Sequence, residues 1–192
     1  MISLTKMVTT MIQIRSNVFE TNSSSTHSIC IPKNVKKIDN FIDFNIGEYG
    51  WENDCVEDTA SYLYTAILSG YGYDEAMDKV KKLADILNRH DIAYRFDKPE
   101  WYVYSDGYKG LENGYIDHAY ETHEFVESVL NDEDMLLRYL SDGIVYTGND
   151  NQDSQPYGCD IADDYCYDYD SNEYVPNPYH DEEKYDYFYK RN

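Results

Sequence analysis

The chain has 192 residues, which suits one domain, or one domain followed by a tail, and is long enough to bury a full core. Its 37 Asp and Glu residues against 16 Lys and Arg residues give a formal charge of −21. Such a charge argues strongly against unaided binding to DNA or RNA, because that binding needs Lys and Arg to neutralise phosphates. A field of this sign attracts basic partners instead, or serves only to keep the protein soluble.

Cysteine usage and hydropathy predict a cytoplasmic protein. Cys30, Cys55, Cys159 and Cys166 form no Cys-x-x-Cys pair, which is typical of free thiols in a reducing compartment. The sequence has no run of about 18 apolar residues, so no transmembrane helix is expected. Residues 1–10 lack the long apolar stretch and the small-residue cleavage site of a signal peptide.

The first polar segment lies between two apolar runs, residues 11–14 and 29–31, that predict strands. Residues 20–28 contain six hydroxyl side chains, a Glu, an Asn and a His, and such side chains hold tight, irregular turns. A polar turn between buried strands is a common place for a reactive or binding site. Ser24 and His27 are therefore candidate site residues; the alternative is a Ser-rich surface loop with a solvated His27.

Hydrophobic periodicity predicts the scaffold that follows. Alternating or short apolar runs predict strands over residues 41–46, 92–96, 101–104 and 144–146. Helical spacing of apolar residues predicts helices over residues 56–69, 74–89, 121–130 and 132–140. Capping preferences place Asp54 and Asp74 at the starts of the first two helices, Gly70 and His90 at their ends, and Gly143 at the end of the last.

The second polar segment centres on Asp117 and His118. In a strand, these neighbours would point to opposite faces, so one would face a site and they would not form a dyad. Farther along, His123 and Glu127 lie four residues apart and share a helix face, which is typical of a surface pair. The alternative is a metal site assembled from both histidines, His118 and His123, with Glu127 and Asp117. The pattern is not His-Glu-x-x-His, however, and we expect neither a metal nor a cofactor.

The third polar segment begins where the predicted strand 144–146 ends. Residues 147–153 follow it directly and include Asn149 and Asp150. A polar turn at the end of a buried strand is a common place for binding residues. An ordinary Asn/Gly turn is the alternative.

The three polar segments resemble signatures of one family. Residues 18–28, Val-Phe-Glu-Thr-Asn-Ser-Ser-Ser-Thr-His-Ser, resemble the opening motif of largely uncharacterised proteins encoded by phages, prophages and related elements, mainly of Firmicutes. Gly-Tyr-Ile-Asp-His at residues 114–118 and Thr-Gly-Asn-Asp-Asn at 147–151 resemble later motifs of that family, in the expected order. The resemblance indicates where a site lies and implies no particular chemistry. Because the family-like pattern begins at Met11, the resemblance also implies a natural start there, with residues 1–10 as an upstream extension.

Composition changes at Cys159. Residues 159–192 contain ten Asp or Glu, three Lys or Arg and eight Tyr. Low-complexity sequence of this kind can stay disordered, but Tyr is suited to interfaces. Carboxylates interleaved with Tyr imitate the charge and stacking surface of a nucleic-acid strand. The candidate binding residues are Asp163, Asp164, Tyr165, Tyr167, Asp168, Tyr169, Asp170, Glu182 and Glu183.

We therefore expect a single α+β domain over residues 11–158, with a mixed or antiparallel sheet of five or six strands and three or four helices, followed by an acidic tail. Two functions fit. The first is a phage-type counter-defence inhibitor that binds a basic nucleic-acid enzyme of the host, with CRISPR effectors as attractive targets. The alternative is a nuclease-like or nucleotide-modifying enzyme built from the three polar segments. Its candidate catalytic residues are His27, His118, Asp117, Ser24 and Asp150.

Overall fold

The computed structural model describes residues 25–34, 38–50, 54–149, 165–168, 170–177 and 180–190, and it has the expected α+β architecture. In these ranges the α-helices are α1 (Thr59–Gly70), α2 (Tyr73–Arg89), α3 (His123–Asn131) and α4 (Glu133–Asp142), and a 3-10 helix, η1 (Ala119–Thr122), precedes α3. The strands are β1 (Ser25–Pro32), β2 (Phe41–Phe44), β3 (Glu48–Tyr49), β4 (Asp54–Val56), β5 (Ala93–Phe96), β6 (Trp101–Val103), β7 (Lys109–Leu111), β8 (Tyr115–Ile116), β9 (Ile144–Asn149), β10 (Tyr165–Asp168), β11 (Glu173–Pro176) and β12 (Tyr185–Lys190).

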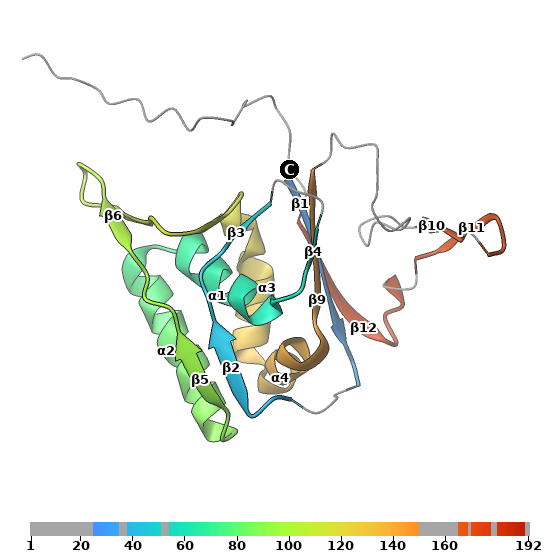
Figure 1. Cartoon of the computed structure of the whole chain (residues 1–192), viewed down its shortest axis with the longest axis horizontal. Coiled ribbons are helices and arrows are strands. Elements are labelled where there is room, and N and C mark those ends of the chain that lie inside the picture. Colours follow the sequence, from blue (N-terminus) through green and yellow to red (C-terminus); the bar gives the residue numbers. More distant parts are fainter. Residues whose placement is uncertain are drawn as a thin grey trace, which may run out of the picture.

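The largest sheet has four strands in the order β12-β1-β9-β4, and every neighbouring pair is antiparallel. It is smaller than the expected five or six strands, because the remaining strands form separate pairs. Of these pairs, β2·β5 and β3·β8 are parallel, whereas β6·β7 and β10·β11 are antiparallel. Figure 1 shows α1, α3 and α4 against one face of the four-stranded sheet, with α2 and β2·β5 beyond α1.

Helix α1 lies at the centre of the core. Every residue from Ala60 to Leu68 is buried, as expected for a helix that is covered on all sides. Its N-cap is Asp58, whose side chain accepts a hydrogen bond from the Ser61 backbone N–H at 3.0 Å. The prediction of Asp54 as the cap was wrong, because residues 54–56 pair with β9 as strand β4.

Hydroxyl groups inside α1 hold the loop that leads to β3. Ser61 Oγ accepts a hydrogen bond from the Asn45 backbone N–H at 2.7 Å, and Thr65 Oγ1 accepts one from the Gly47 N–H at 3.1 Å. Strand β3 then pairs with β8, which brings Glu48 beside Tyr115. The buried helix therefore positions the ends of β3 and β8.

The other helices follow the predicted pattern with small shifts at their ends. Helix α2 begins one residue early, so Gly72 is its N-cap and Asp74 lies in its first turn. His90 caps its C-terminus, as predicted. Helix α4 runs from an Asp132 cap to Gly143, which confirms the predicted end. None of the described helices has the length and apolar character needed to cross a bilayer.

The second face of the four-stranded sheet is also covered. Cys30 and Tyr146 are buried there, and Ile144, Tyr185 and Tyr187 pack against them. Burial raises the pKa of the Cys30 thiol to about 12, so this cysteine stays protonated at neutral pH.

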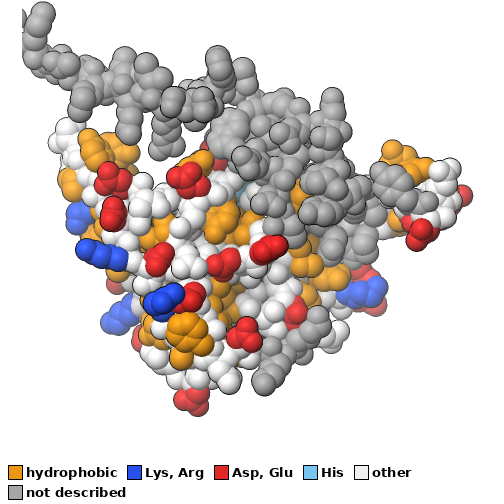
Figure 2. Space-filling view, in the orientation of Figure 1, with side chains coloured by type: hydrophobic (Ala, Val, Ile, Leu, Met, Phe, Trp, Pro, Cys, Tyr) orange, Lys and Arg blue, Asp and Glu red, His pale blue; other side chains and the backbone are white. Residues whose placement is uncertain are grey.

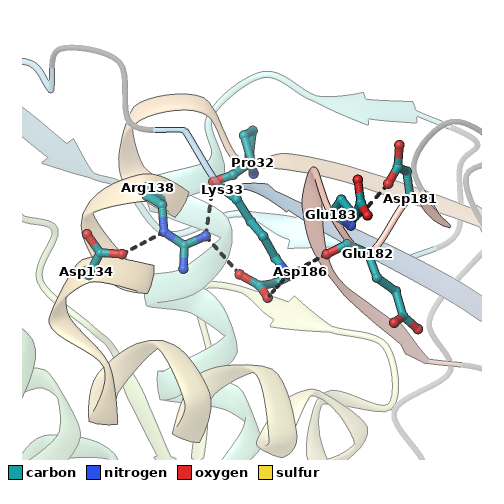
Figure 3. Close-up of polar contacts among 8 residues, drawn as sticks. All are labelled: Pro32, Lys33, Asp134, Arg138, Asp181, Glu182, Glu183 and Asp186. Atoms are coloured by element: carbon teal, nitrogen blue, oxygen red, sulfur yellow. Dashed lines mark hydrogen bonds and ion pairs between the residues drawn. The ribbon is translucent and has the colours of Figure 1, made fainter.

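Strand β12 lies within the acidic segment that composition separates from the domain. It pairs with β1 along its length, from His27↔Lys190 to Pro32↔Tyr185. Figure 3 shows how Arg138 of α4 reinforces the pairing: its guanidinium contacts Asp186 of β12 at 2.8 Å and donates to the Pro32 carbonyl oxygen at 3.0 Å. The composition change at residue 159 therefore does not mark the end of the folded unit.

Candidate functional site

His27 lies in strand β1, with 1% of its surface exposed, and faces α1. Its Nδ1 is 2.7 Å from the hydroxyl oxygen of Tyr62, so the helix fixes the ring orientation. Burial raises the pKa of Tyr62 well above its usual range, and this phenol therefore remains protonated beside the imidazole. The prediction that His27 lies in a turn was wrong, because strand pairing with β9 already begins at Ser25.

Gly50 marks the point where the first two polar segments meet. A Cβ built on Gly50 would lie 3.1 Å from His27 Nε2 and 2.7 Å from the Cβ of Asp117. The Asp117 backbone N–H donates to the Tyr49 carbonyl oxygen at 3.0 Å, which extends the β3·β8 pairing to this point. Absence of a side chain at Gly50 thus allows Asp117 and His27 to approach the same space.

Asp117 and His118 form a turn after β8, whereas the conditional prediction placed them in a strand. His118 has a left-handed backbone with φ of 51°, which ends the strand. Its Nε2 lies 3.9 Å from Asp117 Oδ1, so the two side chains are neighbours and do not point to opposite faces. Both are partly exposed, with 36% of the His118 side chain and 23% of the Asp117 side chain open to solvent.

The third polar segment joins the same sheet. Strand β9 continues beyond residue 146 to Asn149, and so Thr147 and Gly148 are strand residues and not part of a turn. In the antiparallel register Thr147 lies directly opposite His27, and directly paired residues share a face of the sheet. Thr147 is 3% exposed, so it is buried beside the imidazole.

A small pocket opens beside His27 between β1, β12 and the start of α3. It is lined by His27, Ile29, Glu121, Thr122, Glu124, Phe125 and Phe188. One carboxylate oxygen of Glu121 is buried here without a hydrogen-bond partner. A His fixed by a Tyr, with carboxylates nearby, has the groups that proton transfer requires.

His123 and Glu127 have structural partners. The ring of His123 stacks on Tyr71 with centroids 4.1 Å apart, and its Nε2 is 2.6 Å from the Gly70 carbonyl oxygen. Lys79 forms an ion pair with Glu127 and lowers the pKa of that carboxyl group. Across the described ranges, no three His, Cys, Asp or Glu side chains are grouped so that they could hold a metal ion.

Several predicted site residues lie outside the described part of the chain. Ser24 and Asp150 of the candidate catalytic set do, as do Asp163, Asp164 and Tyr169 of the candidate binding set. Glu182 and Glu183 are described, and both lie exposed in the turn before β12.

The remaining candidate binding residues form a hairpin, β10·β11, that projects from the body of the molecule on the side away from the helices (Figure 1). Figure 2 shows apolar and acidic side chains together on it. Tyr165 and Tyr174 are 60% and 74% exposed. At the turn, Asp168 accepts hydrogen bonds from the Ser171 hydroxyl and the Asp170 backbone N–H, which lower the pKa of its carboxyl group.

Sequence reasoning missed Tyr62, Gly50 and Glu121 as members of the His27 cluster. Tyr62 lies within the predicted helix over residues 56–69 and Gly50 follows the predicted strand over residues 41–46, and neither was a candidate site residue. Their partners lie far away in the sequence, and hydrophobic periodicity carries no information on such contacts. Comparison with family models, with curated proteins and with solved structures finds no match to this chain.

Proposed function

We propose that this protein is an inhibitor that binds a basic, nucleic-acid-handling enzyme through its acidic β10·β11 hairpin. The projecting hairpin, with its exposed tyrosines and ionised carboxylates, is the observation that supports this function. The resemblance of residues 18–28 to a phage-type motif makes a host defence enzyme, such as a CRISPR effector, the target class. Such effectors hold nucleic acid in positively charged channels.

The hairpin has features that a partner would stabilise. A two-stranded hairpin is marginally stable in water by itself. Its register places Asp168 directly opposite Glu173, and like charges in this position are destabilising. Tyr167 and Tyr174 pair across the strands with ring centroids 5.2 Å apart. A basic groove would relieve the repulsion between the carboxylates and cover the rings.

The rest of the surface adds a general attraction. Most described basic side chains already pair with carboxylates: Lys33, Lys79, Arg89, Arg95, Arg138 and Lys184. The acidic excess is therefore left on the surface. Figure 2 shows carboxylates spread over one face among apolar and basic side chains, and so this face has no continuous acidic strip like that of a nucleic acid. The hairpin is the better candidate for the contact surface.

Removing the hairpin charges is expected to weaken target capture. The triple variant Asp168→Asn, Asp170→Asn, Glu173→Gln should bind a basic effector about tenfold less tightly, because exposed charge pairs contribute about 0.2–1 kcal/mol each. The matched control neutralises three carboxylates on α2, by Asp74→Asn, Asp78→Asn and Asp85→Asn. Titration against a purified CRISPR effector, at low and high salt, measures both variants. Equal weakening by the two variants would refute a role for the hairpin.

A second candidate function is a nuclease-like or nucleotide-modifying enzyme. The approach of His27 and Asp117 over Gly50, with Thr147 in register and Glu121 in the adjoining pocket, specifically favours it. In such an enzyme, His118 would act as the general acid or base that exchanges a proton with substrate or solvent, because it is partly exposed and lies beside Asp117. His27, held by Tyr62, would orient the cluster.

Replacing His118 by Ala tests this second function. The side chain is partly exposed, so the variant should unfold at nearly the same temperature as the original protein. Cleavage of a short RNA should fall at least a hundredfold if His118 is a general acid or base. His90→Ala is the control, since His90 is about equally exposed but pairs with Glu133 at the far end of α2. Undiminished inhibition of a target by the His118 variant would leave binding as the mechanism.

A further inference from the structure

An open pocket lined by tyrosines includes neither residues of the β10·β11 hairpin nor His27 in its lining. It is bounded by the C-terminal end of α1, the β6·β7 hairpin, β8 and the start of η1. Leu111 and Ile116 contribute its apolar lining, and Tyr104, Tyr108 and Tyr120 stand around it. The pocket has a volume of about 360 Å³, which is ample for one long side chain.

Rings around this pocket are exposed and arranged at angles to one another. Tyr104, Tyr108 and Tyr120 are 50%, 52% and 60% exposed. The Tyr104 and Tyr108 ring centroids are 5.7 Å apart, with the ring planes tilted by 43°. Gly110 makes this arrangement possible, because a Cβ there would lie 3.0 Å from the Tyr104 ring. Gly110 therefore leaves the Tyr104 ring room to pack over it at the edge of the pocket.

Neighbouring ring faces already hold ammonium groups of the protein itself. Lys109 Nζ lies 3.7 Å from the centroid of Tyr73, and Lys79 Nζ lies 4.3 Å from that of Tyr71, which lines the pocket. Both distances are in the range of cation–π attraction. Lys109 is the basic residue of the lining, and its charge is engaged by Tyr73 outside it.

Carboxylates flank the tyrosines at the rim. Asp106 accepts a hydrogen bond from the Tyr108 backbone N–H at 3.0 Å, and the neighbouring Glu121 carboxylate raises the pKa of the exposed Tyr120 hydroxyl. Glu48 is exposed and lies beside Tyr115 in the β3·β8 register. Negative charge at the mouth disfavours a nucleotide, whose phosphates it would repel, and favours a cation.

We propose that this pocket binds the arginine side chain of an extended peptide segment of a basic protein. The planar guanidinium stacks on Tyr104 and Tyr120, and its stem packs on Leu111 and Ile116. Asp106 and Glu121 supply the opposite charge at the rim. The site does not include the β10·β11 hairpin, so it does not depend on the proposed inhibitor function. It adjoins the candidate active site, because Glu121 also lines the pocket beside His27 and the rings of His118 and Tyr120 are 6.0 Å apart.

The test uses the complete chain and a blocked Gly-Gly-Arg-Gly-Gly peptide, with binding followed by calorimetry. The matched peptide replaces Arg by citrulline, which keeps the shape and loses the charge. We expect the citrulline peptide to bind about fivefold more weakly, since a cation–π contact at an exposed site is worth about 1 kcal/mol. Equal binding of the two peptides would overturn the proposal.

Paired variants separate a ring effect from loss of apolar area. Tyr104→Phe and Tyr120→Phe keep the ring and should bind the Arg peptide as tightly as the original protein. Tyr104→Leu and Tyr120→Leu should each lose about fivefold. Phe41→Leu, at a similarly exposed ring outside the pocket lining, should change nothing. Leu variants that bind like the Phe variants would refute stacking on these rings.

Two further measurements make the site assignment decisive. The triple variant of the hairpin should retain binding of the Arg peptide, and loss of binding there would move the cation site to the hairpin. Titration of the protein with oligouridylate should give no heat of binding, because the pocket does not bind a nucleobase. Tighter binding of the oligonucleotide than of the peptide, weakened by the Leu variants, would show a nucleobase site instead.

Discussion

Replacing Arg138 by Met is expected to lower the free energy of unfolding by about 3 kcal/mol, one of the largest effects of any single substitution in this chain. The Arg138 side chain is 8% exposed and contacts Asp134 at 2.9 Å and Asp186 at 2.8 Å (Figure 3). Methionine keeps most of the volume but leaves Asp186, which is 25% exposed, without its main partner. Lys33 Nζ remains 3.6 Å away and limits the loss.

The double variant Arg138→Met, Asp186→Asn tests whether the unpaired negative charge of Asp186 causes the loss of stability. If the cost comes from an uncompensated carboxylate, removing that charge should recover more than half of the lost stability. Arg95→Met is the surface control, because Arg95 is 67% exposed in its pair with Asp43, and it should cost less than about 1 kcal/mol. Urea unfolding measures all four proteins. Equal losses for Arg138→Met and Arg95→Met would contradict the buried role of Arg138.

The Arg138 network also explains why strand β12 was missed from the sequence. Residues 185–189 read Tyr-Asp-Tyr-Phe-Tyr, and alternation of this kind is a strand signal. The acidic composition of the whole segment outweighed this signal, because like charges predict a solvated chain. Pairing with β1 and the contact with Arg138 cancel much of that penalty. Neither interaction is visible in a local window.

Elements that depend on local signals were predicted well. Helix α2 has one apolar stripe, and α4 has both a capping Asp132 and a terminal Gly143, so periodicity and caps agree. The N-cap of α1 was misplaced because Asp54 and Asp58 are chemically equal candidates. Only the pairing of Asp54 with Thr147 of β9 removes the first from the helix.

The candidate site was predictable as a set of segments but not as a geometry. The sequence indicated three polar segments, and the register of β1 with β9 and the Gly50 contact bring parts of all three together. The turn conformation of Asp117 and His118 was not predicted, because a positive φ at a non-glycine residue is set by its surroundings. The hypothesis of an active site remains a prediction that the His118 variant tests.

Replacing Gly50 by Ala is the second substitution with a large expected effect, a loss of about 3 kcal/mol or more. Two costs combine. Gly50 has φ of 129°, a conformation in which a side chain is strained by about 1–3 kcal/mol. The new methyl group would also lie 2.7 Å from the Cβ of Asp117 and 3.1 Å from His27 Nε2, and overpacking of this kind costs about 1–3 kcal/mol.

Gly107→Ala separates these two costs. Gly107 has φ of 88° in the turn between β6 and β7, and a Cβ there would meet nothing within 4 Å. It should therefore show the backbone strain alone, about 1 kcal/mol. The additional loss in Gly50→Ala then measures the contact with Asp117 and His27, and it should be accompanied by a shift of the His27 ring signals in NMR spectra. If both variants lose the same stability and the His27 signals stay in place, the two polar segments do not meet at Gly50, and the candidate active site loses its geometric basis.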